Sequence, residues 1–267
     1  MTTDTNYSTK HSVKENFSQA ASYYDEHAEV QRGIADRLIA SLRPWIDILP
    51  EGPILEVGCG TGFVTQGLIE LLPDRELEIT DISPEMLETC RGKYGGYKNT
   101  TFRTLDAEEF DADPETYAMT VNGFVAQWFK HPAITVGKFL EATKPGGLLL
   151  GSFPGNESFP EWKEACRELG LPYTGNELPD TEEILIKLSG GPVQVDYYED
   201  TVTQQFDSAA DFFRHIKKVG AGTQQQGRHL SPKELQLLIN HWDEKSDGNI
   251  QVSYHVVFIA VKRNFDS

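Results

Sequence analysis

Three glycines, each separated by one residue, follow a short apolar run in the first quarter of the chain. The segment reads Ile-Leu-Glu-Val-Gly-Cys-Gly-Thr-Gly-Phe over residues 54–63. Glycines in this pattern let the chain turn sharply after a strand and bring its backbone close to a ligand. Dinucleotide-binding turns space their glycines as G-x-G-x-x-G and bind a pyrophosphate. Here Glu56 stands two residues before Gly58, and a carboxylate at that place favours a cationic ligand group over a pyrophosphate.

Acidic residues follow the next two apolar strands. Asp81 ends the run 77–80, and Asp106 follows the run 101–105. An acid at the end of the second strand, about 20 residues after the glycines, can accept hydrogen bonds from both ribose hydroxyls. Because the carboxyl ends of parallel strands meet at one edge of a sheet, the glycine turn and both acids are expected there together. These residue types predict a site for a nucleoside that carries a cationic group.

The elements that position these residues alternate between strand and helix. Such alternation predicts a mostly parallel sheet with helices on both faces. The apolar runs predict strands at 54–57, 77–80, 101–105, 117–122 and 148–153, and the helical periodicity predicts helices at 63–72, 83–93 and 134–143.

The flanking regions have a different rhythm. Apolar residues from 13 to 43 recur at helical spacing and predict two helices, with a bend near 25–27 or at Gly33. After Pro154 we expect helices at 158–169, 181–188, 209–219 and 231–242, with strands at 193–206 and 252–261. The resulting prediction is a disordered tail at 1–12, lid helices at 13–43, a core at 44–205 and 247–263, and an inserted helical lid at 206–246.

The glycine segment, together with Asp81-Ile-Ser-Pro-Glu-Met-Leu, resembles the first motifs of class I S-adenosylmethionine methyltransferases. The resemblance implies a Rossmann-like α/β fold with a mostly parallel seven-stranded sheet and helices on both faces. It implies S-adenosylmethionine as the cofactor, S-adenosylhomocysteine as its product, and no metal. The strand 117–122 departs from that family, because it lacks the usual aspartate.

By the same resemblance the cofactor residues can be assigned. Ile82 and Met86 would pack near the adenine, Asp106 would bond its amino group, and Asn122 would stand at the methionine end. Gln31 and Tyr24 would belong to a lid helix over the cofactor. The full set expected to bind the cofactor is Gln31, Glu56, Gly58, Cys59, Gly60, Gly62, Asp81, Ile82, Met86, Asp106, Ala107 and Asn122.

Four further segments resemble the malonyl-acyl carrier protein O-methyltransferases of biotin synthesis. They are residues 16–31, 124–128, 213–230 and 252–261. Gly222 departs from that family, which usually has threonine there. The resemblance implies methyl transfer to the free carboxylate of a malonyl thioester on acyl carrier protein or coenzyme A, which starts pimeloyl synthesis. A carboxylate has a pKa of about 4, so it is ionised at neutral pH and needs no general base.

The candidates for catalysis and for binding the malonyl group follow from this chemistry. Arg228 is the first candidate to bind the carboxylate, because a guanidinium can hold it at two points. The other members of the predicted catalytic set are Tyr24, Gln127, Trp128 and His255, with His27 and Tyr254 as further pocket candidates.

The net charge of the chain and its distribution limit the kinds of partner that we expect. The formal net charge is -17, which argues against broad nucleic-acid binding. From Arg214 to Lys233, however, the chain has cations and histidines but no acid, and such an island could steer an acidic carrier protein. The alternative is an ordinary solvated helix face. The predicted partner residues are Arg214, Lys217, Lys218 and Lys233.

The remaining features favour reduced cysteines and a cytoplasmic location, and we expect a monomer, although no sequence feature specifies the oligomeric state. Cys59, Cys90 and Cys166 show no metal-ligand spacing, and no apolar run reaches the roughly 20 residues of a membrane span. The first residues do not resemble a signal peptide. Three alternatives stay open at this point: a methyltransferase for another small carboxylic acid or a quinone-type precursor, a non-catalytic protein that binds S-adenosylmethionine, and a nicotinamide oxidoreductase, which Glu56 and the glycine spacing disfavour.

Overall fold

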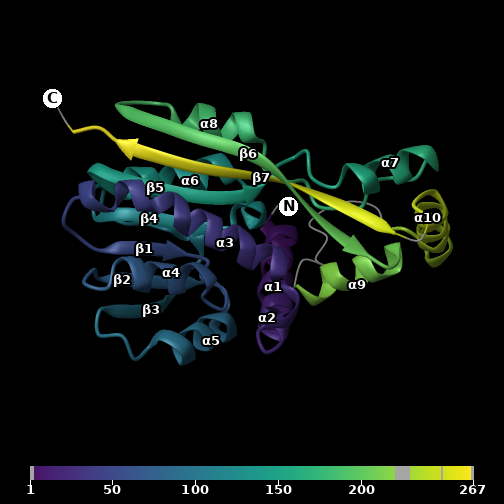
Figure 1. Cartoon of the computed structure of the whole chain (residues 1–267), viewed down its shortest axis with the longest axis horizontal. Helices are drawn as coiled ribbons and strands as arrows, with labels where there is room; N and C mark the ends of the chain where they lie inside the picture. The colour runs from purple at the N-terminus through teal and green to yellow at the C-terminus, as the bar shows by residue number, and fades with distance from the viewer. Residues whose placement is uncertain (1–2, 220–228, 248, 266–267) are drawn as a thin grey trace.

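The computed structural model describes residues 3–219, 229–247 and 249–265. Within them lies a seven-stranded sheet with the order β3-β2-β1-β4-β5-β7-β6 (Figure 1). The strands β1 to β5 are parallel, whereas β7 is antiparallel to both of its neighbours. The mostly parallel sheet expected from the alternation is therefore confirmed. The bounds are β1 (Ile54–Val57), β2 (Leu77–Asp81), β3 (Thr100–Thr104), β4 (Tyr117–Gly123), β5 (Thr143–Pro154), β6 (Val193–Phe206) and β7 (Ile250–Arg263).

The register of the central strands brings their carboxyl ends together. Val57 at the end of β1 pairs with Thr80 of β2 on one side and with Asn122 of β4 on the other. All four residues of β1 are buried, as is usual for a central strand that is covered on both faces. The glycine turn after β1 and the acid that ends β2 therefore lie at one edge of the sheet.

Helices cover both faces of the parallel strands. One face carries α3 (Glu29–Leu42), α4 (Phe63–Leu71) and α5 (Pro84–Tyr94), whose apolar side chains join a core that includes Leu38 and Leu68. The other carries α6 (Pro132–Ala142) and α8 (Thr181–Leu188), whose core includes Phe139 and Leu188. Short 3-10 helices follow at η1 (Arg43–Ile48), η2 (Ala107–Glu109) and η3 (Ala126–Trp128).

The antiparallel pair of β6 and β7 extends beyond the parallel strands, and further helices lie at its far end (Figure 1). These distal helices are α7 (Pro160–Glu168), α9 (Ala209–Lys218) and α10 (Pro232–Lys245). The inserted helices predicted between the last two strands are α9 and α10. The sequence had placed α7 in the core region, but Trp162 of α7 packs on Phe212 of α9 with ring centroids 5.7 Å apart. An aromatic cluster thus joins α7 to the insertion.

The N-terminal region is more ordered than the sequence suggested. α1 spans Thr3–Ala20, so the predicted disordered tail at 1–12 is helical from its third residue. The second half of α1 packs against the protein through the buried residues Val13 and Ala20. Once this half is fixed, each further residue that joins the helix adds one backbone hydrogen bond. The bend falls around α2 (Tyr24–His27), while Gly33 lies inside α3. No helix among the described residues is long and apolar enough to cross a membrane.

Candidate functional site

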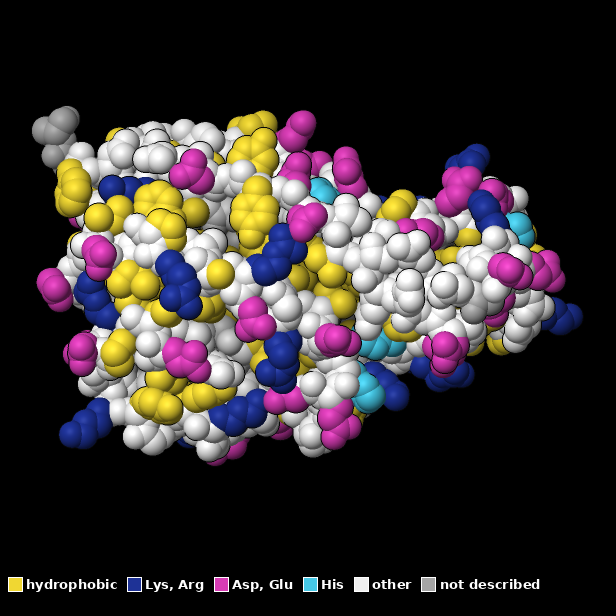
Figure 2. Space-filling view, in the orientation of Figure 1, with side chains coloured by type: hydrophobic (Ala, Val, Ile, Leu, Met, Phe, Trp, Pro, Cys, Tyr) yellow, Lys and Arg dark blue, Asp and Glu magenta, His cyan; other side chains and the backbone are white. Residues whose placement is uncertain are grey.

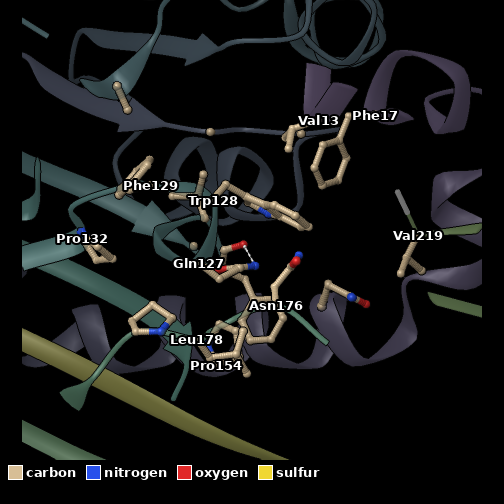
Figure 3. A pocket seen from close by; sticks show the side chains of 18 of the residues that line it. Val13, Phe17, Gln127, Trp128, Phe129, Pro132, Pro154, Asn176, Leu178 and Val219 are labelled. Carbon is tan, nitrogen blue, oxygen red and sulfur yellow. Dashed lines mark hydrogen bonds between the residues drawn. The ribbon is translucent and has the colours of Figure 1, made fainter. Parts of the chain in front are cut away.

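A cavity of about 2040 Å³ opens at the carboxyl edge of the parallel strands (Figure 3). Its wall begins at the glycine turn with Gly58 and Gly60, passes beneath Phe17 of α1, and continues to Phe213 and Tyr254 among the distal helices and β7. Both halves of the sheet therefore contribute to one continuous space, which is large enough for two small ligands side by side.

The glycine turn needs its glycines for two different reasons. Gly58, Gly60 and Gly62 have φ angles of 72°, 55° and 100°, in the left-handed region that glycine alone adopts easily. A Cβ added to Gly58 would lie 2.6 Å from Cγ2 of Val125, and one added to Gly62 would lie 2.5 Å from the Tyr94 ring. A Cβ on Gly60 would meet no protein atom within 4 Å. Gly58 and Gly62 thus serve packing, whereas Gly60 faces open space that a ligand can approach.

Asp81 connects this turn to the start of α5. Its Oδ2 accepts a hydrogen bond from the Gly60 N–H at 2.8 Å, and its Oδ1 accepts one from the Ser83 N–H at 2.8 Å. Burial raises the pKa of Asp81 to about 6, while these backbone hydrogen bonds oppose the rise. The carboxylate lines the cavity, as expected of a group that binds ribose hydroxyls.

Glu56 lies behind the turn, which differs from the expectation that it faces the ligand directly. Its side chain is buried, is absent from the cavity lining, and accepts a hydrogen bond at Oε2 from the Thr65 hydroxyl at 2.6 Å. Oε1 has no hydrogen-bond partner. Burial raises the pKa of Glu56 to about 7, and the nearby charge of Asp81 adds to the rise. In the protein without a ligand, the ionised form of Glu56 is therefore energetically unfavourable.

Unpaired buried atoms at the cavity wall indicate where a polar ligand end would bind. Gln31 Oε1 on α3 and Ser152 Oγ on β5 are both buried without a hydrogen-bond partner, and both residues line the cavity. Buried polar atoms are normally paired, so these two fit a ligand with donors of its own, such as an ammonium group. At the opposite end, Asp106 accepts a hydrogen bond from the Glu108 N–H at 3.0 Å.

Most of the predicted cofactor residues meet at this part of the wall. The lining includes Gln31, Gly58, Cys59, Gly60, Asp81, Ile82, Met86, Asp106 and Ala107. Ile82 and Met86 supply an apolar surface beside the two acids, which suits an adenine ring. The residues present therefore fit a nucleoside with a cationic amino-acid end.

Besides Glu56, the predicted residues Asn122 and His255 lie outside the wall because of strand alternation. Successive side chains on a strand point to opposite faces. Tyr254 lines the cavity, so His255 points away, and its Nε2 lies 3.4 Å from Oε1 of Glu199. Asn122 is also buried behind the wall, and neither of its amide atoms has a hydrogen-bond partner. Neither His255, predicted for the substrate pocket, nor Asn122, predicted for the methionine end, therefore lines the cavity.

The N-terminal helices, which the sequence predicts to form a lid, contribute Phe17, Tyr24 and Gln31 to the cavity wall. Tyr24 lines the cavity, and the next residue, Asp25, accepts hydrogen bonds from the Thr61 hydroxyl at 2.5 Å and from Lys93 Nζ at 2.6 Å. Burial raises the pKa of Asp25, but these two hydrogen bonds outweigh it and the pKa is lowered. Lys93 also donates to the Thr61 carbonyl at 2.9 Å. Asp25 therefore ties the lid to the glycine turn, a role that no local sequence pattern indicated.

The same lid reaches the other part of the cavity. Phe17 of α1 packs edge-on against Trp128 with ring centroids 5.2 Å apart. Gln127 Nε2 donates to the Phe124 carbonyl at 2.7 Å, which fixes the amide beside Trp128. Figure 3 shows Asn176, a residue of the α7–α8 loop that sequence reasoning missed, close to Gln127 and Trp128 at the cavity wall. Uncharged polar and aromatic side chains thus line this part of the cavity.

The predicted basic island is only partly at the cavity. Lys217 lines it, whereas Lys218 and Lys233 are exposed outside it. Arg214 forms an ion pair with Asp211, one turn earlier on α9, so the predicted island has an acid at its border. Arg228, the first candidate for the carboxylate, and Gly222 lie outside the described residues. His27 does not line the cavity. No group of three or more metal-ligating side chains occurs among the described residues.

Comparison with known proteins agrees with this geometry. A family model described as a methyltransferase domain matches residues 54–147, the part that carries the glycine turn and both acids. The malonyl-acyl carrier protein O-methyltransferase of Magnetococcus marinus is 31% identical over 260 residues, which cover 95% of this chain and 93% of that protein. The protein of the same name from Acetivibrio thermocellus is 29% identical over 92% of each chain.

Solved structures show the same fold. The YcgJ protein of Bacillus subtilis matches with a TM-score of 0.61 at 15% identity, over 86% of this chain and all of that one. A putative methyltransferase of Bacillus halodurans matches with a TM-score of 0.57 at 15% identity, over 84% of this chain and 99% of that one. The glycine turn, the paired strand-end acids and the full-length similarity lead to one conclusion. The chain belongs to the family of malonyl-acyl carrier protein O-methyltransferases, S-adenosylmethionine-dependent enzymes with the class I fold.

Proposed function

We propose that this protein transfers the methyl group of S-adenosylmethionine to the free carboxylate of a malonyl group on acyl carrier protein. The product would be the methyl ester that starts pimeloyl synthesis for biotin. The observation that carries the proposal is the 31% identity that extends over 95% of the chain, distal helices included. A match to the methyltransferase core alone would support only the cofactor, because the fold does not specify the acceptor.

The cofactor side of the cavity supports the first half of this reaction. Bound there, S-adenosylmethionine supplies an electrophilic methyl group on its sulfonium. Asp81 would bind the ribose hydroxyls, and Asp106 would bind the adenine amino group beside Ile82 and Met86. The unpaired atoms of Gln31 and Ser152 would meet the methionine end. Glu56 would act from behind the turn through its charge.

The acceptor side has to orient the malonyl carboxylate, which is a nucleophile without any activation by the protein. The malonyl carboxylate is ionised at neutral pH, so no protein group has to remove a proton. Alignment and exclusion of water then carry the catalysis, and good orientation can contribute roughly 7–11 kcal/mol. Tyr24, Gln127 and Trp128 line the place where the two ligands would meet, beneath the lid residue Phe17. Arg228 stays our candidate for binding the carboxylate.

The carrier protein would approach from the side of α9. In Figure 2, Lys, Arg and His side chains lie near the place of this helix with Asp and Glu side chains among them, and Lys217 and Lys218 are exposed. Acyl carrier proteins are acidic, and complementary charge accelerates association. A coenzyme A thioester could replace the carrier. A cytoplasmic location and a monomeric state are part of the proposal.

The test is a direct assay of methyl transfer. The purified protein is mixed with labelled S-adenosylmethionine and, in parallel, with malonyl-acyl carrier protein, malonyl-coenzyme A or free malonate, and the methyl ester is identified by mass. We expect transfer to the carrier-bound group at a kcat/KM at least 100-fold above that for free malonate. Equal transfer to free malonate would instead favour a small-acid methyltransferase. Cofactor binding without any transfer would contradict the substrate assignment.

A further inference from the structure

The part of the cavity formed by the distal helices, the α7–α8 loop and β7 is lined by aromatic side chains. We call it the aromatic arm and define it by Phe159, Trp162, Tyr173, Phe213, Ile216 and Tyr254. Their rings meet edge to face, with centroids 4.8 Å apart for Trp162 and Tyr173 and 5.1 Å apart for Trp162 and Phe213. Four separate elements supply them, so the arm is a product of the tertiary fold.

The backbone at the entrance of this arm is strained. Phe159, just before α7, has φ 62° and ψ 40°, a left-handed conformation that is unfavourable for a residue with a side chain. Its N–H donates to the Ser253 carbonyl at 2.8 Å, and its ring packs edge-on against Tyr254 at 4.9 Å. Strain of this kind concentrates at functional sites, where the surrounding structure maintains it. The contacts hold the Phe159 ring at the cavity wall.

A polar group in the arm lacks a partner within the protein. The Tyr173 hydroxyl is buried and has no hydrogen-bond partner, and Trp162, against which its ring packs, is also buried. Pockets for small ligands combine apolar walls with a few polar groups of this kind. The arm therefore fits a chain that is mostly apolar and carries amide groups.

Along helix α9, the character of the lining residues changes from apolar to cationic. Phe213, Ile216 and Lys217 of this helix all line the cavity, and among them Lys217 is the exposed residue. The wall thus changes along one helix from aromatic to cationic as it approaches solvent. A ligand with an uncharged chain and an anionic outer end would match this order.

We propose that the aromatic arm binds the pantetheine chain of the malonyl thioester, with the Tyr173 hydroxyl bonded to one of its amides and Lys217 facing the phosphate at its outer end. This rests on the proposed function and adds to it the place of the thioester chain. A free dicarboxylic acid is too short and too charged to use these walls. The continuity of the arm with the cofactor side supports a single extended acceptor.

The experiment compares two acceptors that carry the same malonyl group. One is the malonyl thioester of pantetheine, and the other is the malonyl S-ethyl thioester, which has no amide. We expect the native enzyme to prefer the pantetheine thioester by at least 10-fold in kcat/KM. Tyr173→Phe removes only the hydroxyl and should lower this preference about 3- to 10-fold, as expected for one hydrogen bond. Phe213→Ala should lower it further.

Tyr197→Phe is the matched control, because Tyr197 is an exposed tyrosine on β6. Its preference between the two thioesters should equal that of the native enzyme, and the affinity of each variant for S-adenosylhomocysteine verifies its fold. A native preference near unity, or an equal loss on both thioesters in Tyr173→Phe, would overturn the assignment of the arm. Absence of methyl ester from either thioester would instead contradict the proposed function itself.

Discussion

The two sides of the cavity are built in different ways. On the cofactor side, the polar groups come from strand ends and tight turns between Gly58 and Asp106, and the parallel register of β1, β2 and β4 brings them together. On the acceptor side, the wall is assembled from residues between Phe159 and Tyr254 on α7, the following loop, α9 and β7. The comparison teaches that one side offers backbone groups and acids, which suit a ligand of fixed shape, while the other offers rings, which suit the longer ligand that we propose.

Removal of Asp81 is the largest change we expect, and it should affect the cofactor side alone. Asp81→Ala removes the acceptor for the ribose hydroxyls and leaves the N–H groups of Gly60 and Ser83 unpaired. Hydrogen bonds to a charged group contribute about 1.5–3 kcal/mol each, so the affinity for S-adenosylhomocysteine should fall at least 100-fold by calorimetry. Asp36→Ala, on the exposed face of α3, is the control. Retention of affinity within 10-fold would contradict the assigned role.

Substitution of Glu56 should show how much the buried carboxylate destabilises the cofactor-free protein. Burial raises the pKa of Glu56 from 4.5 to about 7, so the folded state binds this proton more tightly than the unfolded state. Stability from this group is fully present below pH 4.5 and is lost as the pH rises to about 7. Glu56→Gln should therefore raise the free energy of unfolding by about 3 kcal/mol at pH 8 and by less than about 1 kcal/mol at pH 5.

Urea denaturation of the cofactor-free protein at the two pH values measures this difference. The affinity of Glu56→Gln for S-adenosylmethionine should fall at the same time, because the carboxylate charge is what favours the cationic end. Glu70→Gln, an exposed residue on α4, serves as the control. A stability difference that is equal at pH 5 and pH 8 would rule out the titration of Glu56 as its cause.

Neutralisation of α9 should give the smallest effect and should touch the acceptor side alone. With Lys217→Gln and Lys218→Gln combined, we expect the KM for malonyl-acyl carrier protein to rise about 10-fold at low salt, with the cofactor affinity unchanged. The effect should shrink in 0.5 M salt, where exposed charges are screened over roughly 4 Å. Lys98→Gln, near β3 at the other end of the sheet, is the control. A change in cofactor affinity would break the separation of the two sides.

Much of the parallel half could be predicted because its signals are local. Each strand from β1 to β5 falls within the predicted alternation, and the glycine turn and its acids are contiguous motifs. The depth of a side chain is a different matter. Whether Glu56 faces the ligand or the core depends on the helix α4 above it, where Thr65 binds its carboxylate. Sequence spacing alone does not contain that information.

The distant contacts could not be predicted for a related reason. Asp25 meets Thr61 and Lys93 only after the lid and α5 have packed, and no periodicity links these positions. His255 is the opposite case, because a signal was present. In the first half of β7, the polar residues Gln251, Ser253 and His255 alternate with apolar ones. This alternation places the side chain of His255 on the face of the sheet opposite to Tyr254.

The contacts of Asp25 lead us to expect a fixed order of ligand binding and release. We expect a nucleoside beneath Tyr24 to exchange slowly while Asp25 stays bonded to Thr61 of the glycine turn and to Lys93, since both bonds anchor the segment above it. The thioester, which arrives from the side of α9, does not have to break these bonds. We therefore expect the nucleoside to bind first and to depart last, so that accumulated S-adenosylhomocysteine competes with fresh cofactor and not with the acceptor.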